Sequence, residues 1–456
     1  MSQQENADLS KGSPIRLLFK LALPAIVAQI INVLYNMVDR MYIGHIPKIG
    51  AQALTGVGVT MPIIMSISAF AALVSMGGAP RAAIMMGKKD EKSAEKILGN
   101  CFGALIIVAV LLTVFFQLFG RQILLMFGAS NTTIEYAWQY MSIYTLGTIF
   151  VQIALGMNAF ITTQGFAKIS MATVMIGAIC NIILDPIFIF VLGFGVRGAA
   201  FATIISQGIS SVWVIHFLTS KKSNLRIQKK HLKLEPKILL PCLALGISPF
   251  IMQFTESALT ISFNTSLQKY GGDLAVGAMT ILYNVMQFSM LPLQGLAQGA
   301  QPIVSFNYGA NKLDRVKKTF ICLLTTSLIY STMIWAVSMF APIVFIKIFT
   351  DNIQLTQMAI HSMRIYMAAS LIFGAQIACQ QTFISLGNAV YSLFLAFLRK
   401  VILLIPLIFI LPMFLTNKVD AVLLAEPVAD VIAVSTTCSL FYYSFKKLST
   451  LNEYKP

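Results

Sequence analysis

Carboxylates that stand inside apolar runs are the residues of this sequence with the most chemistry to offer. Asp39 ends a polar stripe in an otherwise apolar segment; the other members, Gln29, Asn32 and Asn36, precede it at spacings of three or four residues. Residues at this spacing share one face of a helix, so the stripe is expected to face protein rather than lipid. Pro24 precedes the stripe and could kink the helix, because proline removes a backbone hydrogen bond. Bending at Pro24 could therefore be coupled to the state of Asp39.

A second acidic position lies in a later apolar run. Asn181 and Asp185 are one helical turn apart, and Thr203 adds a hydroxyl from the following run. Two carboxylates close together in a low dielectric cannot both stay ionised cheaply, so either one carries a proton or a cation lies between them. Asp39, Asn181, Asp185 and Thr203 therefore predict a site for H⁺ or Na⁺, and a static packing network is the alternative. We expect no other metal site.

The second half of the chain carries its own stripe, formed by Gln253, Glu256, Thr260 and Asn264. Glu256 is interpreted as a lone carboxylate in an apolar cavity, which would suit an organic cation. A second ion site is the alternative. With Gln29, Asn32 and Asn36, Gln253 and Glu256 form the predicted substrate-binding or second ion site.

Further charges lie deep in the last two apolar runs. Glu426 and Asp430 are one turn apart, and Arg399 precedes Lys400 in the run before them. Salt bridges would lower the cost of burying these groups. Arg399, Glu426 and Asp430 are therefore predicted to form a polar network, with either a functional or a structural role.

Several kinds of chemistry find no support. The sequence has no GxxxxGK[ST] phosphate loop, no HExxH element and no Ser/His/Asp constellation. The GxGxxG match at 193–198 joins two apolar runs and is interpreted as a tight turn. We therefore predict no enzyme activity and no cofactor, with an ion gradient as the energy source.

The elements that must position these residues are membrane helices. The chain has 456 residues, of which 57% are hydrophobic and only 11% charged, with a net charge of +16. The charge lies in short clusters between apolar runs, which favours a membrane protein over a nucleic-acid binder. Apolar runs long enough to cross a bilayer predict an all-α polytopic protein with twelve transmembrane helices, at about 15–43, 53–78, 97–119, 136–161, 171–192, 199–219, 238–267, 274–298, 319–346, 357–383, 391–415 and 421–444.

The two halves of the sequence repeat each other. Pro80 and Gly87 correspond to Pro302 and Gly309 at an offset of 222 residues. Six helices per copy give both copies the same orientation, with a cavity expected where they meet. We predict an N-lobe at 1–220, a basic cytoplasmic linker at 221–237 and a C-lobe at 238–456. The excess of Lys and Arg in alternate loops predicts that both termini are cytoplasmic.

Four motifs make the chain similar to the multidrug and toxic compound extrusion (MATE) family, in its DinF- and MepA-like prokaryotic branch. They are Leu34-Tyr35-Asn36-Met37-Val38-Asp39, Asn181-Ile182-Ile183-Leu184-Asp185-Pro186, the segment Gly299 to Ala310, and Ala425-Glu426-Pro427-Val428-Ala429-Asp430. The resemblance implies two six-helix lobes and export of organic cations by H⁺ or Na⁺ antiport. It also implies that Asp39, Asn181, Asp185 and Thr203 form the coupling site.

The resemblance is incomplete in the C-lobe. Another branch of the family uses acids on the seventh and tenth helices, and the tenth helix here has none. The expected setting is a multi-pass monomer in the inner, or cytoplasmic, membrane of a prokaryote. A flippase for lipid-linked saccharides or peptidoglycan precursors is the rival function, and it would be expected to place several cationic residues in its cavity.

Overall fold

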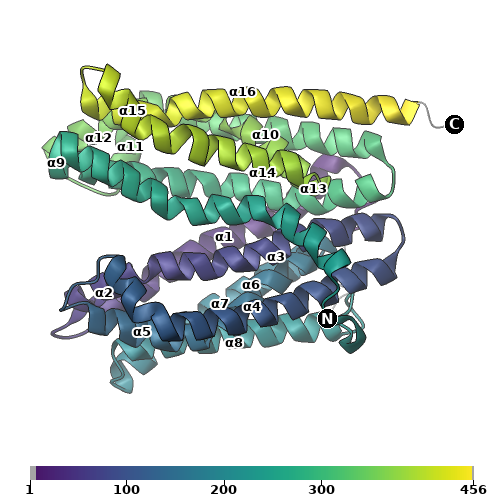
Figure 1. The fold of residues 1–456 in the computed structure, drawn as a ribbon, viewed down its shortest axis with the longest axis horizontal. Helices are drawn as coiled ribbons and strands as arrows, with labels where there is room; N and C mark the ends of the chain where they lie inside the picture. The colour runs from purple at the N-terminus through teal and green to yellow at the C-terminus, as the bar shows by residue number, and fades with distance from the viewer. Residues whose placement is uncertain (1–6, 454–456) are drawn as a thin grey trace.

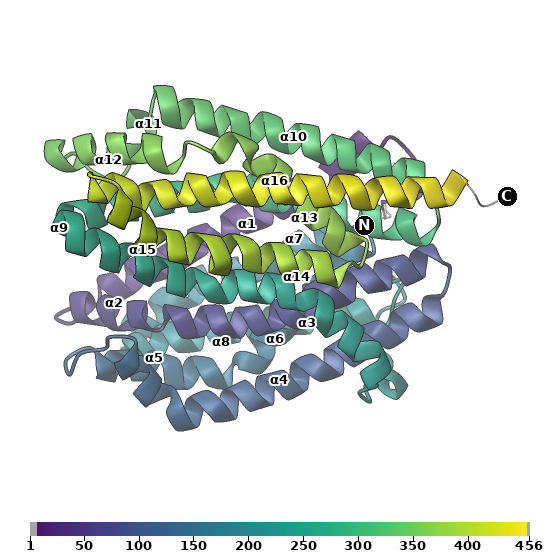
Figure 2. The same ribbon diagram turned by 45° about the horizontal axis from the view of Figure 1, so that its top comes forward.

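The structure is a computed structural model that describes residues 7–453. Both chain ends, which we predict to be cytoplasmic, lie outside this range. The helices run roughly side by side along the long axis in both views (Figure 1 and Figure 2). The first half of the chain forms α1 (Pro14–Gly44), α2 (Gly50–Val59), α3 (Met61–Gly87), α4 (Glu91–Met126), α5 (Ile134–Leu146), α6 (Thr148–Thr163), α7 (Ala167–Pro186), η1 (Ile187–Val191) and α8 (Val196–Thr219).

The second half begins after a connection that contains η2 (Lys229–His231). It forms α9 (Pro236–Gly309), α10 (Leu313–Phe340), α11 (Ile343–Ile346), α12 (Ile353–Tyr366), η3 (Ser370–Ile372), α13 (Phe373–Ser385), α14 (Ala389–Phe397), η4 (Leu398–Leu404), α15 (Ile405–Phe414) and α16 (Lys418–Glu453). In Figure 1, α1–α8 occupy the lower part of the molecule, and α10–α16 with most of α9 occupy the upper part.

The number of membrane spans agrees with the sequence. Among the described residues, nine helical segments are long and apolar enough to cross a bilayer, and two bent helix pairs add one span each. Helix α9 supplies two spans in its 74 residues, because the chain reverses at Gly272, whose φ of 63° is open to glycine at little cost. The prediction of twelve transmembrane helices in two six-helix lobes is confirmed.

Three spans are less regular than predicted. The fourth bends by 58° between α5 and α6, and the tenth by 49° between α12 and α13. Gly147 lies at the first bend, where a Cβ would come within 2.3 Å of Ile204 Cγ2, so the bend depends on close contact with α8. The predicted helix at 319–346 is wrong at its end: α10 stops at Phe340, and Pro342 precedes the separate helix α11.

Helices also extend beyond their apolar runs. Helix α4 begins at Glu91, six residues before the predicted span, because Asp90 caps it by accepting a hydrogen bond of 3.0 Å from the Ser93 amide. Hydrogen bonds from Ser93 also lower the pKa of the Asp90 carboxyl. The apolar run fixes the part inside the membrane, whereas the cap fixes where the helix begins.

Glycines bring the two lobes into backbone contact. A Cβ on Gly87 of α3 would lie 2.0 Å from the carbonyl oxygen of Phe306, and one on Gly309 of α9 would lie 2.0 Å from that of Ile84. Gly87 and Gly309 are equivalent positions of the sequence repeat, so this reciprocal contact lies where the two copies meet. Small residues allow this close approach between membrane helices.

Candidate functional site

The predicted N-lobe residues come together. Asp39 near the end of α1, Asn181 and Asp185 on α7, and Thr203 on α8 are all buried, and Asp185 has no exposed surface. The Asn181 Nδ2 donates to Asp185 Oδ1 at 3.1 Å and approaches Thr203 Oγ1 at 3.5 Å. The carboxyl groups of Asp39 and Asp185 lie close enough to interact electrostatically.

Three oxygens in this cluster lack a hydrogen-bond donor. They are Asp39 Oδ1, Asn181 Oδ1 and Asp185 Oδ2, all buried and without a partner among the described residues. Burying unpaired oxygens is costly, and more so when two of them belong to neighbouring carboxyl groups. A proton or a small cation bound here would satisfy them, so the arrangement can bind positive charge.

Tyrosines that the sequence analysis did not select complete this cluster. Tyr140 on α5 is only 3% exposed, stacks on Tyr144 with ring centroids 5.9 Å apart, and lies near Asp39 and Thr203. Tyr35 lies one turn before Asp39 on α1. The sequence repeat pairs Tyr144 with Tyr366, 222 residues later, and the structure places Tyr366 beside the acids of the C-lobe.

A non-standard helical turn borders each cluster. The π-helical turn η1 follows Asp185 and Pro186 directly. The π-helical turn η4, which carries Arg399 and Lys400, ends two residues before Pro406. Proline lacks the amide that a regular helix needs, so the backbone near it can shift to wider hydrogen bonding. Such turns re-aim side chains, which allows the consecutive residues Arg399 and Lys400 to serve different partners.

The C-lobe charges form a buried network. Arg399 Nε donates to Asp430 Oδ1 at 2.7 Å, and Arg399 Nη2 donates to Glu426 Oε1 at 2.8 Å. The same guanidinium lies 4.7 Å from the ring centre of Phe373. Lys400 forms an ion pair with Glu256 and donates to the Met252 carbonyl oxygen at 2.8 Å. The interpretation of Glu256 as a lone carboxylate is therefore wrong.

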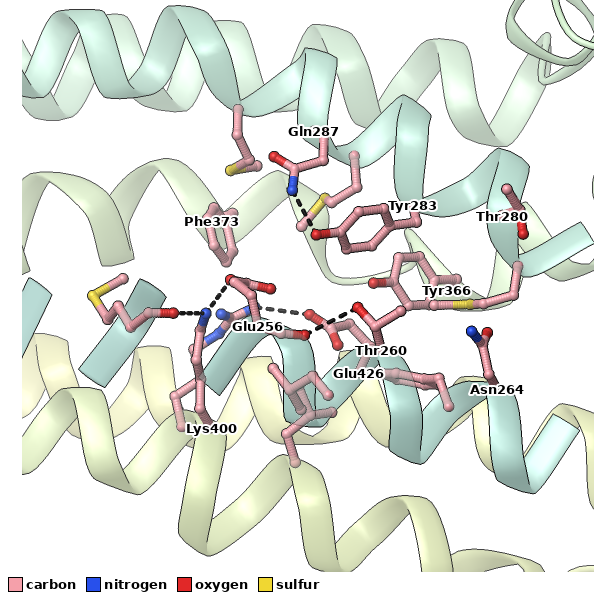
Figure 3. A pocket seen from close by; sticks show the side chains of 18 of the residues that line it. Glu256, Thr260, Asn264, Thr280, Tyr283, Gln287, Tyr366, Phe373, Lys400 and Glu426 are labelled. Atoms are coloured by element: carbon pink, nitrogen blue, oxygen red, sulfur yellow. Dashed lines mark hydrogen bonds and ion pairs between the residues drawn. The ribbon is translucent and has the colours of Figure 1, made fainter. Parts of the chain in front are cut away.

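A cavity of about 230 Å³ opens beside this network, within the C-lobe (Figure 3). Glu256 and Lys400 lie at one end of it, and Tyr283 and Gln287 hydrogen-bond to each other across from them at 2.7 Å. Four methionines line the remaining wall with aromatic and aliphatic side chains: Met252, Met279, Met286 and Met290. A Met-rich wall around a few charges can adapt to ligands of different shapes.

The other residues of the predicted substrate site lie elsewhere. The cavity lining includes Glu256 but not Gln253. Gln29, Asn32 and Asn36 lie along α1, and the side-chain amide of Asn36 donates to the Asn32 carbonyl oxygen at 2.6 Å. Spacing placed these residues on one helix face, but it could not show which cavity that face would meet.

Pro24 lies inside an unbroken α1 and is buried. The backbone on either side of it touches α9. A Cβ on Gly299 would lie 2.6 Å from the Ala22 nitrogen, and one on Gly295 would lie 2.8 Å from the Ile26 nitrogen. The proline segment of the N-lobe therefore packs into a glycine groove of the C-lobe.

Two six-helix lobes, each with buried charges in its interior, define a polytopic membrane transporter. The sequence profile of the MatE family matches the chain twice, at residues 24–187 and 249–410, once in each half. The chain belongs to the MatE family, whose members are membrane transporters and not enzymes.

Relatives and solved structures are similar to the chain over almost its whole length. The chain is 24% identical to the multidrug export protein MepA of Staphylococcus haemolyticus strain JCSC1435, covering 96% of this chain and 97% of that protein. Against MepA of Staphylococcus aureus strain N315 the identity is 24%, over 95% and 96% of the two chains. The fold matches a crystal structure of MATE in the bent conformation with a TM-score of 0.92 at 21% identity, over 99% of both chains. It matches one in the straight conformation with a TM-score of 0.89, also at 21% identity, over 98% of this chain and 99% of that one.

Proposed function

We propose that this protein is a cation-coupled antiporter that exports cationic or amphipathic organic compounds across the cytoplasmic membrane. The observation that carries the proposal is the buried carboxyl pair of Asp39 and Asp185, each of which has one unsatisfied oxygen, beside a third unsatisfied oxygen on Asn181. Asp39, Asn181, Asp185 and Thr203 supply only hard oxygen and amide groups, which suit H⁺ or Na⁺.

The cation and the compound exchange through alternating access. A cation enters the outward-open N-lobe and neutralises the Asp39/Asp185 pair, which favours bending of α1 near Pro24 and release of the exported compound. For this coupling, the cation and the compound must favour different states of the two lobes. The contact of the Pro24 segment with α9 supplies a route between the lobes.

The C-lobe cavity is the proposed binding site for the exported compound. Its charged network contains three carboxyl groups, on Glu256, Glu426 and Asp430, against the cations of Arg399 and Lys400. With all five groups ionised the network is one charge negative, which favours a cationic ligand. The adaptable Met wall suits ligands of varied shape, and the relatives named as multidrug export proteins agree with this substrate class.

The rival flippase would need free cationic groups for a phosphate. Arg399 and Lys400 do reach the cavity, but both are already held by carboxylates. This pairing favours organic cations over lipid phosphates. We further propose that the lobes at 1–220 and 238–456 move as two bodies around the linker at 221–237, in a monomer with both termini in the cytoplasm.

Ethidium accumulation in bacterial cells tests this function. Cells that make the wild-type protein should accumulate less dye than cells with an empty vector. Asp39→Asn should insert normally but accumulate dye like the empty vector, whereas Asp273→Asn, which changes an exposed acid, should behave as wild type. Full export by Asp39→Asn would refute the coupling site. If wild type exported none of several cationic dyes, the substrate class would be refuted and the flippase favoured.

A further inference from the structure

The linker between the two lobes is fastened to the N-lobe. Gln164, 1% exposed at the end of α6, accepts hydrogen bonds with its Oε1 from Ser223 Oγ at 3.0 Å and from the Leu225 amide at 2.8 Å. Asn100 of α4 has no exposed surface; its Oδ1 accepts from the Glu235 amide at 2.6 Å, and its Nδ2 donates to the His231 carbonyl oxygen at 3.3 Å. The buried side-chain amides of Gln164 and Asn100 thus hold both ends of the linker in place by hydrogen bonds. We call this pair of amides the clasp.

Apolar anchors support the same conformation. Leu225 is fully buried in the N-lobe core, and Leu234 packs against that core. Between them, the linker backbone lies directly on α4: a Cβ on Gly103 would come within 2.5 Å of the Leu232 carbonyl oxygen. Polar and apolar contacts together fix the path of the linker.

The sequence of α4 indicates that this path lies near the membrane surface. The charged residues at the start of α4 end at Lys96, the apolar run begins at Ile97, and the next charged residue of the helix is Arg121 near its other end. The linker crosses α4 at Gly99 and Gly103, where the helix passes from charged to apolar sequence. This is the depth at which a transmembrane helix meets lipid headgroups.

The clasp leaves the cations of the linker pointing outward. All seven are exposed, and none forms an ion pair with a residue that the structure describes. They are Lys221, Lys222, Arg226, Lys229, Lys230, Lys233 and Lys237. Glu235 is the one acid among residues 221–237, and Glu95 of α4 accepts hydrogen bonds from the Arg226 amide and the Gln228 side chain. These two acids leave five of the seven positive charges without a compensating negative charge in or against the linker.

We propose that the clasped linker is a binding surface for anionic phospholipid headgroups of the cytoplasmic leaflet. Clusters of four to eight basic residues next to a membrane helix attract anionic lipids. Here the clasp adds pre-organisation, because the cations are already held at headgroup depth and little ordering remains when lipid binds. The bound lipids hold the N-lobe end of the linker against the membrane.

Native mass spectrometry of protein extracted from equal mixtures of phosphatidylglycerol and phosphatidylcholine tests the surface. The measured quantity is the ratio of the two lipids retained per protein. Wild type should retain phosphatidylglycerol in excess. The triple variant Lys229→Gln, Lys230→Gln, Lys233→Gln should lose about tenfold in this ratio. An unchanged ratio would overturn the proposal.

A matched control and a clasp variant separate local from general charge effects. The control Lys312→Gln, Lys317→Gln, Lys318→Gln removes three exposed lysines from the start of α10 and should keep the wild-type ratio. An equal loss in the control would overturn the assignment to the linker. Gln164→Met keeps all seven cations but removes part of the clasp, and it should lower the ratio about threefold. A wild-type ratio in that variant would overturn the role of the clasp.

Discussion

Pro24 lies in α1 between two residues whose backbone touches α9, and this contact makes the proposed hinge testable. In Gly299→Ala the new Cβ would lie 2.6 Å from the Ala22 nitrogen and 2.7 Å from its Cα. Carbon atoms normally pack at about 3.5–4.0 Å, so α1 must move away by about 1 Å. Overpacking of this kind costs about 1–3 kcal/mol in the conformation in which α1 touches α9 at Gly299. The equilibrium constant between this conformation and one with α1 bent away should therefore change by about 5- to 150-fold.

Spin labels on two exposed residues report this shift in a cysteine-free background: Met41 near the end of α1, and Leu274 at the start of the second span of α9, just after the reversal at Gly272. Gly299→Ala should move the distance distribution away from that of the parent protein and change the export rate with it. Gly58→Ala is the control, because a Cβ there meets no atom within 4 Å. If Gly299→Ala kept the parent distribution and export rate, α1 would not be coupled to α9 through this contact.

Two further changes probe the C-lobe. Arg399→Met leaves Glu426 and Asp430 buried without their cation, which should cost about 3–5 kcal/mol and lower the thermal unfolding temperature in detergent. Adding Glu426→Gln and Asp430→Asn should restore most of the loss, and a triple variant as unstable as the single one would contradict the pairing. Lys400→Met frees Glu256 and should tighten binding of a cationic dye about tenfold, as measured by fluorescence polarisation. The double variant with Glu256→Gln should abolish the gain, and a gain that persists would mean that Glu256 does not bind the dye.

The fold and the N-lobe cluster were largely predictable from sequence. Apolar length fixed the twelve spans, and the rarity of acids in apolar runs selected Asp39 and Asp185. Helical spacing then placed Asn181 beside Asp185, because residues four positions apart are neighbours on one helix. Apolar length, buried acids and helical spacing can each be recognised within a single helix, and no contact between helices is needed.

Contacts between helices were less accessible. Spacing alone could not show that Lys400 of η4 reaches Glu256 of α9, since the two residues are 144 positions apart and η4 winds as a π-helix. The bend at Gly147 likewise depends on Ile204 of a different helix. The linker was predicted from its charge, but its clasp by Gln164 and Asn100 requires three-dimensional proximity that no local pattern records.

Ion movement coupled to dye addition tests the central claim most directly. In proteoliposomes that contain either a pH-sensitive or a Na⁺-sensitive indicator, addition of a transported cationic dye should drive H⁺ or Na⁺ in the opposite direction through the wild-type protein. Asp39→Asn and Asp185→Asn should each abolish this ion movement, and Asp273→Asn should leave it unchanged. Ion movement at the wild-type rate in either of the first two variants would contradict a coupling site at the Asp39/Asp185 pair.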